Sequence, residues 1–187
     1  MTTTPNSARR GIPFRLIGWG GAAFVLLLPL LTNAPWTLSD YVVMGVMLGG
    51  AGLVLEAAAR MSGNLLYKAG IALAVAASFL LIWVNLAVGF LGNEGNPANL
   101  MFLGVILVAI LGSVFAGFRA DGMARAMFAA AAAQLLVGVA GLAAGWASPG
   151  PHGIYEVTMG TALFVALWFV SGVLFHKAAR QPAAAAR

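Results

Sequence analysis

Four polar side chains between positions 85 and 99 have the types and spacing that could do chemistry. Three amides and one carboxylate lie on Asn85, Asn96, Asn99 and Glu94, in a part of the sequence whose other residues are apolar apart from Asn93. Amide and carboxylate oxygens hydrogen-bond polar solutes and coordinate cations. These residues are therefore the candidate outer site of a transporter or channel for a small solute or ion.

The same residues also have a local structural interpretation, as the turn between two helices. Asn96 suits the N-cap of the second helix, and Pro97 suits its first position, where a backbone N–H is not needed. Glu94 lies beside that N-terminus, where a negative charge is favourable. Asn85 lies about two turns inside the first helix, and we expect its amide to meet Asn99 or a nearby backbone carbonyl.

Two further polar residues, Glu56 and Gln134, lie within the apolar runs. Glu56 precedes Arg60 by four residues, which predicts an ion pair at a helix end, and a proton or cation site is the alternative. Gln134 is near the middle of its run, where such a group usually hydrogen-bonds to a neighbouring helix and the alternative is a pore lining. The other polar residues of this kind are Ser78, Ser113 and Thr161.

Most other chemistries are excluded by what the sequence lacks. The absence of cysteine excludes disulfides, thiol catalysis and sulfur-ligated metals. His152 and His176 are the only histidines, and about 36 Å of helix would separate them. One chain therefore cannot use both for one metal or haem, and His152 with Glu156 would make a weak outer metal site at most. No metalloprotease, phosphate-binding or dinucleotide motif occurs, so we expect a non-enzymatic protein without metal or cofactor.

The composition is typical of a membrane protein, for which the lipid bilayer is the first partner. Of 187 residues, 61% are hydrophobic and 8% are charged, whereas soluble domains carry about 25% charged residues. Six apolar runs approach or reach the length needed to cross a hydrocarbon core about 30 Å thick. They are 16–31, 41–59, 69–91, 100–118, 123–146 and 154–175. The sequence therefore predicts an all-α fold, a polytopic bundle of six transmembrane helices.

We expect a single transmembrane domain at 15–177, between cytoplasmic tails at 1–14 and 178–187. Run 16–31 is the shortest of the six, and its basic start is also compatible with a signal peptide. Pro35 directly follows the candidate cleavage site after Ala34, which disfavours cleavage. We therefore predict that the first helix is retained.

The positive charges predict the orientation of the helices. Strict alternation of six spans puts all ten Lys and Arg residues on one side of the membrane and none on the other. Cytoplasmic loops of membrane proteins collect Lys and Arg. We therefore predict a bacterial inner-membrane protein with both termini in the cytoplasm, and no nucleic-acid partner. The ten residues are Arg9, Arg10, Arg15, Arg60, Lys68, Arg119, Arg125, Lys177, Arg180 and Arg187.

A weak internal repeat relates two parts of the chain. A shift of 59 residues lays Arg60 on Arg119 and Gly63 on Gly122. This match predicts two parallel copies of one hairpin, at 41–91 and 100–146, as occurs in some transporters. The alternative is a chance match between two Ala- and Gly-rich segments.

Pairs of glycines four residues apart indicate where two helices can pack closely. Gly45 with Gly49, and Gly141 with Gly145, have the spacing that lets two membrane helices approach closely. Such packing serves the bundle itself, a membrane-protein partner or a homo-oligomer. The motif does not choose between them.

Residues 83–100, WVNLAVGFLGNEGNPANL, carry a resemblance to a known family. Together with the tracts 56–67 and 119–125, they resemble a family of small multi-pass inner-membrane proteins of Gram-negative bacteria. The family pattern is W-x-N-x-A-V-G-x-x-G-S-E-D-N-P-A-N-L, and this sequence departs from it at Asn93 and Gly95, which stand in place of Ser and Asp. The resemblance implies a location, and it carries no activity.

Two function classes remain, with a lipid- or quinone-associated membrane enzyme in third place. The first is a non-enzymatic accessory or interaction subunit, which the lack of buried charge and the small-residue packing favour. The second is a small-solute or ion transporter or channel. It would use Asn85, Glu94 and Asn99 as its outer entrance and Gln134 as a contact at mid-membrane depth.

Overall fold

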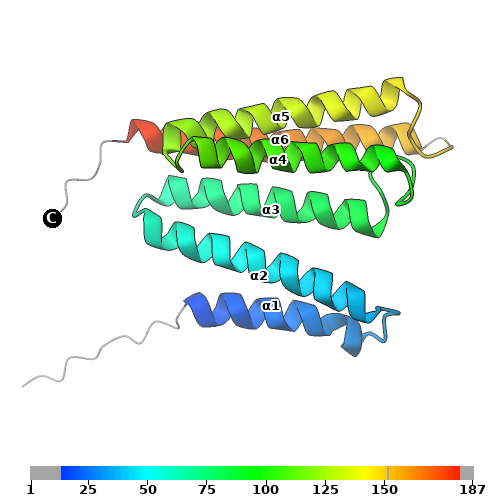
Figure 1. Ribbon diagram of the computed structural model, residues 1–187, viewed down its shortest axis with the longest axis horizontal. Coiled ribbons are helices and arrows are strands. Elements are labelled where there is room, and N and C mark those ends of the chain that lie inside the picture. The colour runs from blue at the N-terminus through cyan, green and yellow to red at the C-terminus, as the bar shows by residue number, and fades with distance from the viewer. Residues whose placement is uncertain (1–13, 151, 182–187) are drawn as a thin grey trace, which may run out of the picture. The chain divides into compact units, whose positions relative to one another are not determined.

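The computed structural model describes residues 14–150 and 152–181, apart from the side chains of Phe14, Arg15 and Ile17. These residues form helices and no strand, which confirms the predicted all-α fold (Figure 1). The predicted tails at 1–14 and 178–187 lie largely outside the described residues. The helices are α1 (Phe14–Leu31), α2 (Leu38–Met61), α3 (Leu65–Ala87), the 3-10 helix η1 (Pro97–Leu100), α4 (Met101–Phe115), α5 (Ala120–Ala143) and α6 (Gly153–Arg180).

Within the described residues, five helical segments are long and apolar enough to cross a membrane. They are α2, α3, η1 with α4, α5 and α6. The apolar part of α1 is shorter, Gly18–Leu31. The chain thus has the helices of a membrane protein, and five of the six predicted spans meet this criterion of length and composition.

The chain forms two compact units, which divide between Leu53 and Val54. The first unit contains α1 and most of α2. In it, the indole of Trp19 covers Gly52, where a Cβ atom would lie 2.9 Å from the ring. A glycine at this position therefore lets the ring of α1 rest on the backbone of α2.

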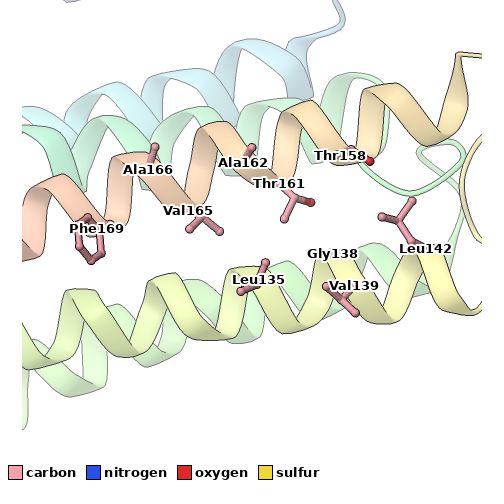
Figure 2. A pocket seen from close by; sticks show the side chains of 10 residues that line it. All are labelled: Leu135, Gly138, Val139, Leu142, Thr158, Thr161, Ala162, Val165, Ala166 and Phe169. Atoms are coloured by element: carbon pink, nitrogen blue, oxygen red, sulfur yellow. The ribbon is translucent and has the colours of Figure 1, made fainter.

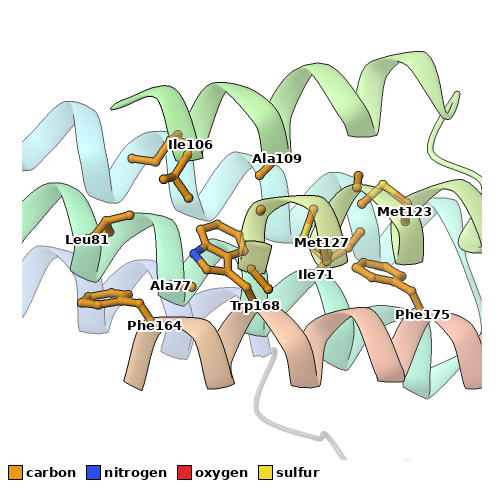
Figure 3. Close-up of a cluster of buried hydrophobic side chains, with 14 of the residues drawn as sticks. Ile71, Ala77, Leu81, Ile106, Ala109, Met123, Met127, Phe164, Trp168 and Phe175 are labelled. Carbon is orange, nitrogen blue, oxygen red and sulfur yellow. The ribbon is translucent and has the colours of Figure 1, made fainter. Parts of the chain in front are cut away.

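The second unit contains the helices α3 to α6, which pack around one hydrophobic core. Helix α5 packs against both α4 and α6, and α6 also packs along α3. Trp168 is fully buried and extends from α6 into the middle of the core cluster (Figure 3). Its large ring is accommodated because alanines supply small side chains to the same cluster, among them Ala77 and Ala109.

Small residues bring the backbones of these helices close together. A Cβ atom at Gly112 of α4 would lie 2.7 Å from the Cβ of Ala126 on α5, and one at Gly138 of α5 would overlap Thr161 of α6. In lipid, where apolar side chains gain little by leaving the bilayer, such close approach is a main source of helix association. The second unit therefore uses its own glycines to pack itself.

Side-chain hydrogen bonds hold the end of the second unit at which α3 begins. The side chain of Asn64 caps α3 by accepting the N–H groups of Leu66 and Tyr67. Its amide nitrogen donates to Gln181 at 2.9 Å, which ties α3 to the end of α6. The hydroxyl of Tyr67 donates to the carbonyl of Phe118 at 2.7 Å. These bonds join α3, α6 and the α4–α5 turn.

The predicted hairpin repeat is not confirmed by the helix boundaries. A shift of 59 residues places the last residue of α2, Met61, on Ala120, whereas α4 ends at Phe115. It places the first residue of α3, Leu65, on Ala124, whereas α5 begins at Ala120. The turn of the second hairpin thus falls several residues earlier than the repeat requires.

Candidate functional site

The turn between α3 and η1 is organised around Asn99. This residue is only 9% exposed, and its Oδ1 accepts the N–H groups of Phe90 at 3.0 Å and of Leu91 at 2.8 Å. Its amide nitrogen donates to the carbonyl of Asn93 at 2.8 Å. The backbone reverses at Gly89, whose φ of 74° favours glycine. The amide of Asn99 is therefore engaged in holding the turn.

Asn96 and Glu94 lie on the outer part of this turn. Asn96 accepts the N–H of Ala98 at 3.0 Å, with Pro97 as the first helical residue, so the predicted cap is confirmed. The helix that it caps is the short η1, which α4 continues from Met101. Glu94 is exposed. Ser148 donates to the carbonyl of Gly92 at 2.8 Å and joins the α5–α6 loop to the turn.

Asn85 is not joined to this turn by a hydrogen bond. Its Nδ2 donates to the carbonyl of Leu81 at 2.7 Å, one turn back in α3, which is the backbone contact expected as one of two possibilities. Its Oδ1 is buried and has no hydrogen-bond partner among the described residues. The structure therefore does not link Asn85, Glu94 and Asn99 into one hydrogen-bonded cluster.

Glu56 forms the predicted ion pair. Its carboxylate lies 2.6 Å from the guanidinium of Arg60, one turn later in α2. A second pair on the same spacing joins Asp121 to Arg125 in the first turns of α5, at 3.4 Å. Both are i,i+4 pairs at helix ends, a geometry that contributes a few tenths of a kcal/mol.

Gln134 is completely buried in the second unit, and neither atom of its amide has a hydrogen-bond partner among the described residues. The hydrogen bond to a neighbouring helix expected for it is therefore not formed. Thr161 Oγ1 and Trp168 Nε1, both on α6, are also buried without a partner. In contrast, the hydroxyl of Ser113 donates to Ala109 of its own helix, and that of Ser171 donates across to Gly70 of α3.

An apolar groove of about 480 Å³ runs between α5 and α6 (Figure 2). Its lining includes Gly138 and Leu142 on α5 and Thr161, Val165 and Phe169 on α6. Figure 2 shows the side chain of Thr161 pointing from α6 towards α5. The groove could not be predicted from the sequence, because it depends on which small residues of the two helices face each other. The small residues of α5 and α6, such as Gly138, were the sequence feature that could have indicated the groove.

The histidines lie apart from these features. His152 precedes α6 and His176 lies in its last part, and both are exposed. No group of three or more His, Cys, Asp or Glu residues that could hold a metal ion occurs in the part of the chain that the structure describes.

Comparison with known proteins does not assign the chain to a family. It matches no protein-family model, no curated protein and no solved structure. The resemblance of residues 83–100 to a family of small inner-membrane proteins therefore stays a prediction. The function must be inferred from the geometry of the chain itself.

Proposed function

We propose that this chain is a non-enzymatic accessory or interaction subunit of the bacterial inner membrane. The observation that supports the proposal is the structural role of Asn99, the most buried residue of the predicted outer site. Its amide forms hydrogen bonds with three backbone groups of its own turn, those of Phe90, Leu91 and Asn93. The most polar segment of the chain thus serves to shape a helical hairpin, and the surface left for function is largely apolar.

The proposal includes six spans with both termini in the cytoplasm. The positive residues at helix ends that this topology assigns to the cytoplasm include Arg60, Lys68, Arg119, Lys177 and Arg180. The sixth span is α1, which has 18 residues and a length of about 27 Å. This is close to the hydrocarbon thickness of about 30 Å, and a short helix is accommodated by local thinning of the bilayer.

The first unit supplies a surface for interaction. No atom of a neighbouring helix in that unit lies within 4 Å of the place that a Cβ would take at Gly18, Gly21, Gly45 or Gly49. In the second unit, by contrast, Gly138 is covered by the side chain of a neighbouring helix. Because small residues favour close helix packing in lipid, the face with Gly45 and Gly49 suits a helix from outside the first unit.

Transport of a small solute or ion is the second candidate function. The observation in its favour is that Asn85 Oδ1 and the Gln134 amide are buried without partners. Polar groups inside a membrane span commonly line a path for a solute. On this account, Asn85 would bind the solute at the outer end and Gln134 would contact it deeper in the bundle.

Purification from native membranes, combined with flux measurements, separates the two candidates. We expect the tagged chain to retain a stoichiometric membrane-protein partner, and the double variant Gly45→Leu/Gly49→Leu to lose it. The matched control is Gly104→Leu on α4, which also has no atom within 4 Å of a Cβ and should retain the partner. Solute-specific uptake into proteoliposomes that Asn85→Ala abolishes would contradict the proposal.

A further inference from the structure

Three unpartnered polar side chains lie within about two helical turns of one another along the α5–α6 packing. A Cβ at Gly138 would overlap Thr161, and one at Gly172 would meet Phe128 at 2.7 Å. These two crossings fix the antiparallel register of the helices. Gln134 lies one turn from Gly138 on the same face of α5, so the register places it between the levels of Thr161 and Trp168. All three are at most 6% exposed.

The depth of Thr161 and Gln134 follows from both helices. Thr161 lies about 12 Å along α6 from Gly153, and Gln134 lies about 13 Å along α5 from Ala143, at 1.5 Å per residue. The two starting points are at the same end of the second unit. With the outer end of these helices at the membrane surface, the polar atoms lie near the bottom of the outer half of a hydrocarbon core about 30 Å thick.

Unpartnered polar groups at such a depth require an explanation. A buried amide or hydroxyl without a hydrogen bond costs free energy, and the great majority of such groups in folded proteins have a partner. Ser113 and Ser171 of the same unit bond to backbone carbonyls. The unpartnered state is thus specific to Gln134, Thr161 and Trp168 within the core helices α4 to α6.

The apolar groove runs along α6 past the level of Thr161. Its lining runs on α6 from Thr158 to Phe169, a length of about 16 Å at 1.5 Å per residue. Gly138 and Thr161 belong both to this lining and to the packed interface. The side chain of Thr161 abuts Gly138, and this residue with its unpartnered hydroxyl belongs to the lining of the groove (Figure 2).

We propose that the α5–α6 groove binds an uncharged amphiphile, with its apolar tail along the groove and a hydroxyl or carbonyl head at Thr161. A hydroxyl or carbonyl head accepts the hydrogen bond that the Thr161 hydroxyl can donate. The head is uncharged because no described Lys, Arg, Asp or Glu lines the groove and a charge at this depth is costly. This site is independent of the proposed interaction role.

Photolabelling in nanodiscs tests the site with two probes of equal length. One probe is a diazirine-bearing hexadecanol, and the other is the corresponding diazirine-bearing hexadecane. We expect the alcohol to label residues 135–142 and 158–169 roughly fivefold more than the hydrocarbon, as one additional hydrogen bond predicts. Equal labelling by the two probes, or preferential labelling of other helices, would overturn the proposal.

Two variants and a matched control assign the preference to the named atoms. Thr161→Val keeps the side-chain shape and should reduce labelling by the alcohol to the hydrocarbon level. Gln134→Met, the second variant, should leave the labelling unchanged, because Gln134 does not line the groove. The control is Thr158→Val, which lies in the same groove but whose hydroxyl already donates to the carbonyl of Ile154 at 2.7 Å. The preference should survive in this control, and its loss there would contradict the assignment to Thr161.

Discussion

The side-chain oxygen of Asn99 accepts the backbone N–H of Leu91 at 2.8 Å, across the reversal between α3 and η1. The same oxygen accepts the N–H of Phe90 at 3.0 Å. Leu91 is fully buried in the core of the second unit. A polar residue that sequence reasoning places in a candidate solute site thus has a structural task, the satisfaction of two N–H groups at the end of a membrane hairpin.

Replacement of this oxygen should destabilise the second unit. Asn99→Leu leaves the N–H groups of Phe90 and Leu91 without a partner, and each buried unsatisfied group costs about 1–3 kcal/mol. We expect a loss of at least about 2 kcal/mol in unfolding of the purified protein in detergent. Asn96→Ala is the control, since it removes one partly exposed cap bond worth about 1 kcal/mol. Equal effects of the two variants would contradict the role of Asn99.

Close packing at Gly138 gives a second prediction. Gly138→Ala places a methyl group on Thr161, so α5 and α6 must move apart at a cost of about 1–3 kcal/mol. Thr161→Ala in the same chain should restore part of that stability. Gly104→Ala has no atom within 4 Å of its new Cβ and should leave the unfolding free energy unchanged or slightly raised. A Gly138→Ala chain as stable as the wild type would show that the helices do not meet at this point.

Removal of the unpartnered amide of Gln134 should raise the stability of the protein, in contrast to the two changes above. Gln134→Met keeps a similar shape and removes a buried amide that has no hydrogen bond. We expect the ligand-free protein to gain about 1 kcal/mol in unfolding free energy, because the desolvation cost of the amide disappears. The measurement is the unfolding free energy of the purified protein in detergent. A clear loss of stability would mean that the amide has a partner within the bundle.

The helices could be predicted from the sequence because their apolar runs are long. The predicted helix ends, however, differ from the observed ends by a few residues. The run 123–146 belongs to a helix that spans Ala120–Ala143. It starts earlier because Arg119 has extended N-cap geometry and Asp121 falls in the first turn, and it ends earlier because Gly145 has a φ of 70°. Because capping residues are polar, a search for apolar residues alone places the start of a helix too late in the sequence.

The site was harder to predict than the fold. The cap at Asn96 and the pair of Glu56 with Arg60 depend on residues a few positions apart, and both were predicted. The bond from Asn99 to Leu91 depends on where the chain reverses, which Gly89 decides. The groove depends on the register between α5 and α6, which no local pattern contains.

Orientation in the membrane is the claim on which the proposed function depends, and cysteine accessibility tests it most directly. The chain has no cysteine, so Ser7→Cys, Glu94→Cys and Arg187→Cys each give a single reactive site. With a membrane-impermeant maleimide on intact cells, we expect Glu94→Cys to be labelled from outside. Ser7→Cys and Arg187→Cys should react only after the inner membrane is opened. Labelling of Ser7→Cys in intact cells would contradict the account, because α1 would then not span the membrane.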